Sequence, residues 1–291
     1  MQLVTWNTQW CRGLDGRVDP ARIVRHALAL GDVDVLCLQE IAVNYPGLAG
    51  APGDQVAQVR AALPVGWQVF FGAAVDEWTA VGRQRFGNLI ATRLPVLQLQ
   101  HHPLPYPPDA GVSTMPRMCS VLTVHDRALG PVRVMTTHLE YYSKPQRMAQ
   151  ALALRALHLQ ACAQAAQPPQ PLQDGSPFQT KAHTPHALLC GDFNLQAHEA
   201  EYAAMTAPLS APEAQGWAQP GAVPLHDAWR LLHPNQPQPP TFCVFDRAYA
   251  PQPVACDFWW VSDSLRAQVR ALYVDGATRA SDHQPVLLVL G

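Results

Sequence analysis

Short runs of apolar residues recur along the whole chain and predict β-strands. Many of these runs are apolar on both faces, which is typical of strands covered by helices on one side and by a second sheet on the other. We expect strands at residues 3–6, 33–38, 68–71, 88–92, 120–124, 132–136, 187–190, 258–261, 269–274 and 286–290.

Two segments carry the start signals of helices. Asp19 and Pro20 supply an N-cap and a proline at the first helical position, and Gly31 ends that segment. In the second segment, Ser143 is followed three residues later by Gln146, the pattern of a capping box. Apolar residues at helical spacing then predict one buried stripe. These are Met148, Ala151, Leu152, Ala156, Leu159 and Ala163.

Three segments rich in proline and polar residues predict loops, at 164–186, 207–224 and 233–240. The first of them is rich in Pro, Gln, Ser and Thr, and it is too short and too polar to form a domain. The chain shows no internal repeat. We therefore predict a single domain over residues 1–291, with mixed strands, helices outside, and 164–186 as a surface loop within it.

Composition favours a globular protein and disfavours a nonspecific nucleic-acid binder. Hydrophobic residues make up 48% of the 291 residues, which is enough for a sizeable core and excludes a disordered or fibrous chain. The net charge is −2, from 20 Lys and Arg against 22 Asp and Glu. Proteins that bind nucleic acid through its phosphates usually carry an excess of basic residues.

The seven cysteines are scattered, odd in number and without a C-x-x-C pair. Several lie inside apolar runs, as Cys37 does, so buried reduced thiols are favoured over a disulfide framework or a zinc site. No basic stretch and apolar run precede the first predicted strand, and no apolar run has the length of a membrane span. We expect a cytoplasmic protein with neither signal peptide nor transmembrane segment.

Polar residues stand at the ends of six apolar runs. They are Asn7, Glu40, His138, Asp192, Asn194, Asp257, Asp282 and His283. Buried carboxylates need a metal or an imidazole as partner, and strand ends are where rigid scaffolds display reactive groups. Each segment alone has an ordinary explanation. Gly-Asp-Phe-Asn is most often a turn, Ser-Asp-His a loop with a local hydrogen bond, Glu40 a solvated strand end and His138 a core histidine.

Together and in this order, these segments resemble the endonuclease/exonuclease/phosphatase superfamily, which includes deoxyribonucleases, abasic-site endonucleases, sphingomyelinases and inositol-polyphosphate 5-phosphatases. The matching segments are Thr5-Trp6-Asn7, Gln39-Glu40, 87–95, Thr137-His138-Leu139, 191–194 and 281–283, and the resemblance runs from residue 3 to residue 290. One departure is Cys256-Asp257-Phe258-Trp259, where the family usually has Ile-Asp-Tyr-Ile. The resemblance implies an α+β, four-layer α/β sandwich, with two mixed β-sheets packed face to face and helices outside.

The resemblance also implies hydrolysis of a phosphoester that depends on a divalent metal ion. Mg²⁺ suits this reaction because it prefers oxygen ligands and keeps water and phosphate in its coordination shell, and Mn²⁺ is a possible substitute. Glu40, assisted by Asn7, is the first-choice ligand set. Asp282, or Asp192 with Asn194, could hold a second ion, so the number of ions stays open.

A water activated by the protein would attack phosphorus. The favoured base is His283, oriented by Asp257, because a carboxylate beside an imidazole fixes its tautomer and raises its pKa. Asp192 is the alternative base, and Asn194 would orient Asp192 or a phosphoryl oxygen. His138 would stabilise the scissile phosphate or protonate the leaving group.

Residues outside these motifs must select the substrate. The candidates are Arg83, Arg85, Asn88, Tyr141 and Arg147. Arg83 and Arg85, with Trp78, fall in a predicted loop before the Gly-Asn motif, where the family often contacts substrate. The other interpretation places Arg147 on a solvated helix face, Tyr141 in packing at a helix start, and Trp78 as an anchor of a surface loop.

Three functions remain open, in decreasing order. The first is a phosphodiesterase or phosphatase acting on a small-molecule or lipid-derived phosphoester, favoured by Thr137-His138-Leu139 and by the slightly negative charge. The second is a metal-dependent endonuclease or exonuclease on DNA or RNA, which needs a local basic groove. The third is an inactive binding module on the same fold, disfavoured because all eight motif positions are intact. Preference for monoesters or diesters, and the oligomeric state, stay open.

Overall fold

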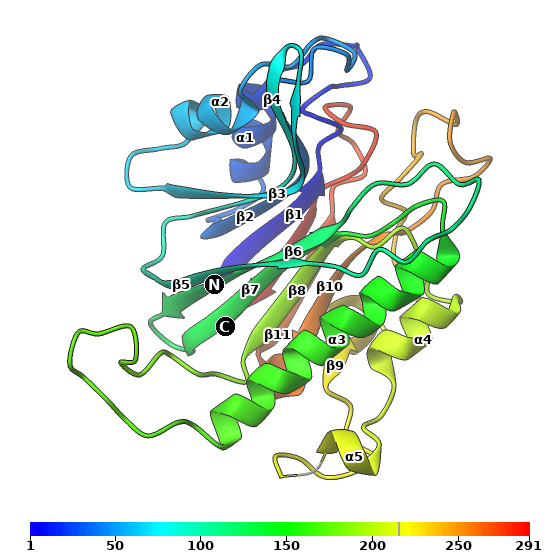
Figure 1. The fold of residues 1–291 in the computed structure, drawn as a ribbon. Helices are drawn as coiled ribbons and strands as arrows, with labels where there is room; N and C mark the ends of the chain where they lie inside the picture. Colours follow the sequence, from blue (N-terminus) through cyan, green and yellow to red (C-terminus); the bar gives the residue numbers. More distant parts are fainter. Residues whose placement is uncertain (215) are drawn as a thin grey trace.

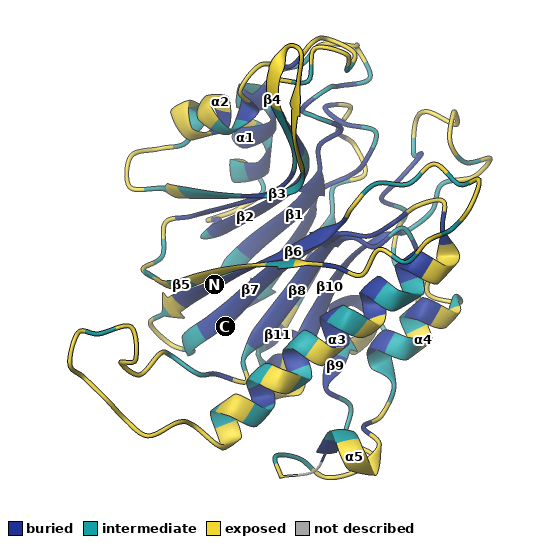
Figure 2. Cartoon of the chain, in the orientation of Figure 1, coloured by how far each residue is buried: buried dark blue, intermediate teal, exposed yellow. Residues whose placement is uncertain are grey.

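The computed structural model describes residues 1–214 and 216–291. Two sheets face each other, and helices cover the outer side of each (Figure 1). This is the four-layer arrangement that the resemblance implied, and it confirms the predicted fold class. The central strands are almost continuously buried, whereas the edge strand β5, the tip of the β3–β4 hairpin, the outward sides of the helices and the loops are exposed (Figure 2).

The first sheet holds both ends of the chain. Its strands are β1 (Gln2–Asn7), β2 (Val35–Val43), β3 (Gln68–Thr79), β4 (Gly82–Thr92), β11 (Val269–Val274) and β12 (Val286–Leu290). Their order is β11-β12-β1-β2-β4-β3, and only β1 and β2 are parallel neighbours in it. Because parallel strands end at the same edge, Asn7 at the end of β1 comes beside Gln39 and Glu40 in β2.

The second sheet repeats this design. Its strands are β5 (Val96–Pro103), β6 (Met118–Asp126), β7 (Gly130–His138), β8 (Ala187–Asp192), β9 (Leu225–Asp227) and β10 (Asp257–Ser262). Their order is β5-β6-β7-β8-β10-β9. β7 and β8 are parallel and pair His138 with Asp192, while β10 is antiparallel to β8 and pairs Asp257 with Asp192. Three predicted site residues therefore lie on adjacent strands.

Helices cover both outer faces, and two short ones contribute Ala228, Trp229 and Leu265 to the core between the sheets. The helices are α1 (Pro20–Leu28), α2 (Gln55–Ala62), α3 (Lys144–Ala166), α4 (Ala200–Thr206), α5 (Ala211–Ala214) and α6 (Ala228–Leu232), with a 3₁₀ helix, η1, at Asp263–Gln268. α1 and α2 pack on the first sheet, and α3 and α4 on the second (Figure 1). Within the described part of the chain, no helix has both the length and the apolar character of a membrane span.

The main core lies between the sheets, and strand periodicity decides what enters it. In β7, Val132 and Val134 point into this core, whereas Met135 points outward, beneath the helices. Trp259 of β10 is fully buried among the same inner residues. Each fully buried side chain of this size contributes about 1.5–3 kcal/mol. The two sheets therefore share one apolar interior, and polar side chains gather at its edge.

Both predicted helix starts are confirmed. The Asp19 carboxylate accepts from the backbone N–H of Arg22, and the Ser143 hydroxyl accepts from that of Gln146 at 3.3 Å. Only half of the predicted capping box forms, because the Gln146 side chain donates to the Pro107 carbonyl at 2.7 Å instead of turning back to Ser143.

The predicted apolar stripe of α3 is wrong in part, since Ala151 is buried and Met148, Leu159 and Ala163 are half-buried. Leu152 and Ala156 are exposed, and the buried side of the helix is instead rich in polar residues. The buried polar residues of α3 are Gln146, Arg147, Gln150, Arg155 and His158. These side chains find partners within the protein, with Gln146 Oε1 as an exception, so α3 can bury polar groups and a purely apolar pattern cannot locate its inner face.

Each expected strand range falls on an observed strand, but several elements were not predicted. β3 and β4 continue as a long hairpin, so Trp78, Arg83 and Arg85 lie on strands, which corrects the predicted loop. β5 and β9 were missed, as were α2, α4, α5 and α6, the longest of which has eight residues. Residues 167–186 carry no helix or strand, but α3 runs to Ala166, so the predicted loop at 164–186 begins three residues too early.

Candidate active site

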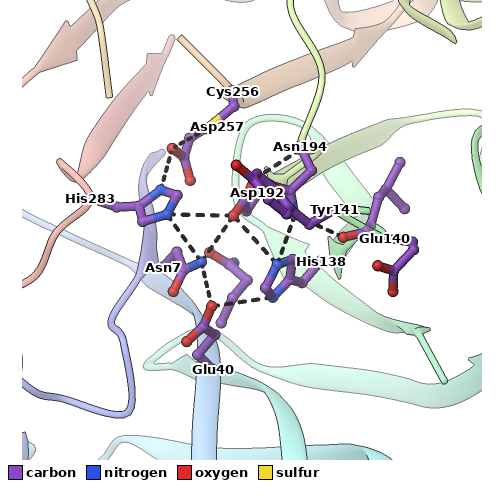
Figure 3. Close-up of polar contacts among 12 residues, drawn as sticks. Asn7, Glu40, His138, Glu140, Tyr141, Asp192, Asn194, Cys256, Asp257 and His283 are labelled. Carbon is purple, nitrogen blue, oxygen red and sulfur yellow. Dashed lines mark hydrogen bonds and ion pairs between the residues drawn. The ribbon is translucent and has the colours of Figure 1, made fainter. Parts of the chain in front are cut away.

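The amide of Asn7 connects residues that are far apart in the sequence. Its Nδ2 donates to Glu40 Oε1 at 3.0 Å and to Asp192 Oδ2 at 2.9 Å, and it lies 3.4 Å from His283 Nε2 (Figure 3). The Asn7 Oδ1 atom accepts from the backbone N–H of Gln9 at 3.1 Å. The expected metal ligand Asn7 therefore acts here as a donor that holds carboxylates together.

Asp192 owes its position to the backbone on both sides. Gly191 has a φ of +138°, and a Cβ at this position would collide with the carbonyl of Thr137, so only glycine lets β8 lie this close to β7. After it, Asp192 Oδ1 accepts from the backbone N–H of Asn194 at 2.9 Å, with Asn194 at a φ of +51°. The Gly-Asp-Phe-Asn segment is thus a turn that also presents a reactive carboxylate.

His283 is held from three directions. Its Nδ1 lies 2.9 Å from Asp257 Oδ2, and its Nε2 lies 3.6 Å from Asp192 Oδ2. The ring of Phe242 stacks on it, with centroids 4.4 Å apart. Burial alone would lower the pKa of His283, but the charges of Asp257 and Asp192 outweigh burial and raise this pKa well above its ordinary value.

The two histidines of the site differ in protonation. Burial, followed by the charge of Arg117, lowers the pKa of His138 to about 3, so this ring is neutral at pH 7. Asn194 Nδ2 donates to the Leu139 carbonyl at 2.9 Å and to His138 Nε2 at 3.0 Å. We assign the proton of His138 to Nδ1, because Nε2 accepts that bond. In the described residues Nδ1 is buried without a hydrogen-bond partner, 3.8 Å from Glu40 Oε1.

Three carboxylates face one pocket with little cationic compensation. Burial, then the charges of Asp282 and Asp192, raises the pKa of Glu40 to about 7, and burial also raises the pKa of Asp282. The one arginine among the lining residues, Arg117, is already paired with Glu140 at 3.2 Å. Crowded oxygen donors of this kind fit a hard divalent cation such as Mg²⁺.

The tightest group of potential ligands differs from the expected set of Glu40, Asn7 and Asp282. In residues 1–214 and 216–291, one trio has ligand atoms within 4.8 Å of one another, and it consists of Asp192, Cys256 and His283. Burial raises the pKa of the Cys256 thiol well above its ordinary value, so Cys256 stays protonated and is a poor ligand. The carboxylates, with their oxygen atoms, remain the better donors for Mg²⁺.

The pocket has a volume of about 180 Å³ and an aromatic rim. Six of the eight motif residues line it, namely Glu40, His138, Asp192, Asn194, Asp282 and His283. Trp10, Tyr141, Tyr142, Phe242 and Tyr249 surround them. The Tyr141 hydroxyl donates to the Tyr249 carbonyl at 3.2 Å, which ties the start of α3 to the segment after residue 241.

Several lining residues were missed from the sequence. Gln9 donates to Asp282 Oδ2 at 2.8 Å, and its place two residues after Asn7 was the available signal. Arg117 directly precedes β6, where an isolated basic residue has no distinguishing pattern. Phe242 and Tyr249 lie in an irregular segment in which Cys243 has a φ of +55°, so no periodicity marks them.

Of the expected substrate-binding residues, Tyr141 lines the pocket, whereas Arg83, Arg85, Asn88 and Arg147 do not. Arg83 pairs with Asp76 at 2.7 Å and lies over the ring of Trp78. Arg85 lies over Phe71, and Asn88 is buried. Arg83 and Arg85 therefore belong to the hairpin, and Asn88 to the core.

Arg147 was predicted either to contact substrate or to lie on a solvated helix face, and both predictions are wrong. It is buried, with Nε 3.3 Å from Glu201 Oε1 and Nη2 3.4 Å from Glu199 Oε1. Its Nη1 donates to the carbonyls of Glu140 and Tyr141. Arg147 is therefore neither solvated nor free to contact substrate, and it fixes the segment that follows His138.

The comparisons with known proteins agree with this geometry. Residues 4–283 match the model of the endonuclease/exonuclease/phosphatase family. No curated protein matches the chain.

Solved structures share the fold over the whole chain. An endonuclease/exonuclease/phosphatase from Beutenbergia cavernae is 23% identical, with a TM-score of 0.69, covering 100% of this chain and 72% of that one. A mannosyl-6-phosphatase from Bacteroides thetaiotaomicron is 17% identical, with a TM-score of 0.66 and coverage of 100% and 99%. The 3′ phosphatase NExo from Neisseria, bound to a product DNA hairpin, is 20% identical, with a TM-score of 0.58 and coverage of 100% and 99%. With its motif residues gathered in one pocket and nearly its full length matched, the chain belongs to the endonuclease/exonuclease/phosphatase family.

Proposed function

We propose that this protein is a Mg²⁺-dependent phosphoester hydrolase that uses water as its nucleophile. The observation that carries this proposal is the contact of one amide, that of Asn7, with Glu40, Asp192 and His283. Phosphoryl transfer requires neutralised phosphoryl oxygens and an aligned water. One metal-binding carboxylate, one water-aligning carboxylate and one charged imidazole lie within 3.4 Å of the same amide nitrogen and can meet these requirements.

Members of the family generally depend on a metal ion. Glu40 and Asp282 are the residues that would hold Mg²⁺ here, because both face the pocket; burial raises the pKa of each carboxyl group, and a cation between them would favour their ionised forms. When bound, the ion supplies positive charge that neutralises the phosphoryl oxygens. Asn7 donates a hydrogen bond to Glu40, and Gln9 donates one to Asp282, so both carboxylates are held in position.

Asp192 and His283 flank the position for the attacking water. Their Oδ2 and Nε2 atoms are 3.6 Å apart, so a water beside the pair, on the pocket side, could contact both. Burial alone would raise the pKa of Asp192, but the charge of the adjacent His283 and the other contacts outweigh burial and lower this pKa below its ordinary value. Asp192 is therefore ionised. Because His283 is charged at the start, we assign water alignment and proton acceptance to Asp192, and contact with a phosphoryl oxygen to His283. This reverses the first choice made from the sequence.

His138 and Asn194 complete the set. The Nδ1–H of the neutral His138 ring is buried 3.8 Å from Glu40 Oε1 and has no hydrogen-bond acceptor among the described residues, so it is the donor that we assign to a phosphoryl or leaving oxygen of bound substrate. Asn194 fixes that tautomer by donating to Nε2. Asp257 keeps His283 oriented from outside the pocket lining.

The rim of the pocket supports a small organic phosphoester as substrate. Aromatic side chains surround the carboxylates, and the one lining arginine is neutralised by Glu140. A nucleic-acid backbone is usually bound by several lysines and arginines. We therefore propose a small-molecule or lipid-headgroup phosphoester, with nuclease action as the alternative. Seven free, buried cysteines support our proposal of a cytoplasmic setting.

Assays of the full chain on a substrate panel test this proposal. The panel holds generic phosphodiesters, phosphomonoesters, phospholipid headgroups, and single-stranded, duplex and abasic DNA, each with Mg²⁺, Mn²⁺ or a chelator. We expect turnover of a small ester with Mg²⁺, less than about one hundredth of it with chelator, and loss of activity in Glu40→Gln. The matched control, Asp174→Asn on the exposed 167–186 loop, should behave as wild type.

Two outcomes would contradict this. Full activity in the presence of chelator would remove the metal from the mechanism. Faster cleavage of DNA than of any small ester, falling steeply with added salt, would favour the nuclease.

A further inference from the structure

The structure describes four buried arginines, and one of them lacks an acidic partner. Arg117 pairs with Glu140, Arg147 with Glu199 and Glu201, and Arg155 with Glu213. In the described residues no carboxylate lies within 4 Å of the fourth, Arg133, although its exposure is 7%. Buried charges are normally paired, because an isolated charge is costly to remove from water.

The contacts of Arg133 leave part of its guanidinium without an acceptor. Nε donates to the Thr184 carbonyl at 3.3 Å, Nη2 lies 2.9 Å from His158 Nδ1, and Nη1 lies 3.9 Å from the sulfur of Met135. The group carries five N–H donors, so these three contacts leave two donors unused, and the sulfur is a weak acceptor. All three partners are electrically neutral, since burial lowers the pKa of His158 to about 3.

Arg133 lines a cavity of about 250 Å³ on the outer face of the second sheet. Its lining residues come from β5–β7, the C-terminal half of α3 and the segment before β8. His102, His183 and Lys181 also line it, together with amide side chains such as Gln100 and Gln160. No aspartate or glutamate is among its described lining residues. The cavity therefore combines cations and hydrogen-bond donors without any negative charge.

We propose that this cavity binds a small oxyanion, either free phosphate or the phosphate group of a small ester, with Arg133 as its anchor. A planar guanidinium with free N–H groups binds phosphate oxygens through paired, charge-assisted hydrogen bonds. The volume is just below the roughly 300–1,000 Å³ of small-molecule sites, which suits an anion with a small organic part and excludes a polymer.

This anion site is separate from the active site. Arg133 and His138 are five residues apart on β7 and point to opposite faces of the sheet, about 17 Å apart at roughly 3.3 Å per residue. His138 faces the carboxylates, whereas Arg133 lies beneath α3. The inference does not rest on the proposed function, and binding can be measured without turnover.

Thermal unfolding of the full chain in the presence of a chelator tests the anion site. Inorganic phosphate, glycerol phosphate and chloride are titrated at matched ionic strength, and the midpoint shift gives an apparent Kd. We expect phosphate or glycerol phosphate to raise Tm and chloride to leave it nearly unchanged. A stronger response to glycerol phosphate would identify an ester as the ligand, and an equal response would identify the free anion.

Variants locate the binding. Arg133→Gln should weaken the apparent affinity roughly tenfold to hundredfold, and Lys181→Ala, at an exposed position, roughly twofold to fivefold. The matched control is Lys144→Ala at the other end of α3, outside the cavity, which should respond as wild type. If Arg133→Gln does not fold, Lys181→Ala and His183→Ala still report on the site.

Two results would overturn the inference. One is a Tm shift with chloride as large as that with phosphate, which is a general salt effect. The other is an unchanged phosphate response in the folded cavity variants, which would place any binding elsewhere, including the active site.

Discussion

The active-site pocket and the layer beneath α3 both bury many polar side chains, yet they treat charge in opposite ways. In the pocket, three carboxylates lie close together, those of Glu40, Asp192 and Asp282. His138 Nδ1 is buried there without a hydrogen-bond partner among the described residues. Beneath α3, Arg147 and Arg155 each have glutamate partners. Unsatisfied polar groups, such as His138 Nδ1 in the pocket and Arg133 farther along the layer beneath α3, mark places where a ligand can complete the set. Paired groups such as Arg147 and Arg155 instead hold the fold together.

The largest expected effect tests the pocket. Asp192→Asn keeps the shape of the side chain but removes its charge, so kcat/KM should fall roughly 10⁴-fold, the upper end for a group that aligns and deprotonates water. The Tm should also fall, because the adjacent His283 lowers the pKa of Asp192 and the ionised carboxylate therefore contributes to the stability of the folded protein. Steady-state kinetics and thermal unfolding of one preparation measure both. A variant that keeps more than about a tenth of wild-type activity would exclude Asp192 from the chemistry.

The second effect tests the layer beneath α3. Arg147→Met leaves Glu199 and Glu201 without their buried partner, so the free energy of unfolding should fall by about 3–5 kcal/mol. Urea denaturation measures this. Lys144→Ala removes an exposed partner of the same Glu199 and should cost about 0–1 kcal/mol. If the free energy of unfolding fell equally in the two variants, the buried ion pairs of Arg147 would contribute no more to stability than the exposed pair of Lys144.

A third, smaller effect returns to the pocket. His138→Gln preserves a donor but loses the ring geometry that Asn194 fixes, so kcat should fall roughly 10²–10³-fold. If His138 stabilises mainly the transition state, KM should stay nearly constant while kcat falls. A rise in KM with unchanged kcat would instead mean that His138 contacts only the ground state.

The smallest effect concerns acid stability. Burial lowers the native pKa of His158 from the ordinary 6.5 to about 3. Between pH 6.5 and pH 3, His158 is therefore protonated in the unfolded chain and neutral in the native chain. Stability should therefore fall as pH falls from 6.5 towards 3. His158→Gln, which keeps an acceptor for Arg133, should remove about 2 kcal/mol of that loss at pH 5. Denaturant unfolding at pH 7 and pH 5 gives the difference, and parallel pH dependences would contradict it.

The same contrast explains how much could be predicted from the sequence. The apolar strands between the sheets follow directly from hydrophobic runs such as the one around Leu188 and Leu189 in β8. β5 was not predicted because it is an edge strand on which Leu97 and Leu99 are exposed. Burial therefore does not impose an alternation of apolar and polar residues on its sequence. The inner face of α3 escaped because Arg155 and His158 are buried through pairing, which depends on residues distant in the sequence.

The candidate site divides along a similar line. Asn7, Asp192 and His283 were predictable because short motifs at strand ends carry them. Their mutual distances, and the donor role of Asn7, depend on three strands that meet only in the folded chain. The aromatic rim could not be predicted, because Phe242 and Tyr249 come from an irregular segment that the rest of the fold positions.

The bulge in β2 has a consequence for any attempt to move this chemistry to another protein. Pairing with β4 breaks between Leu38 and Ile41, and Glu40 in that interval has a φ of +59°. The extra residue lets Glu40 face the carboxylates while Ile41 returns to its place beneath α1 and α2. A transplanted glutamate on a regular strand would point along a different direction, so a designer must copy the irregular backbone together with the side chain.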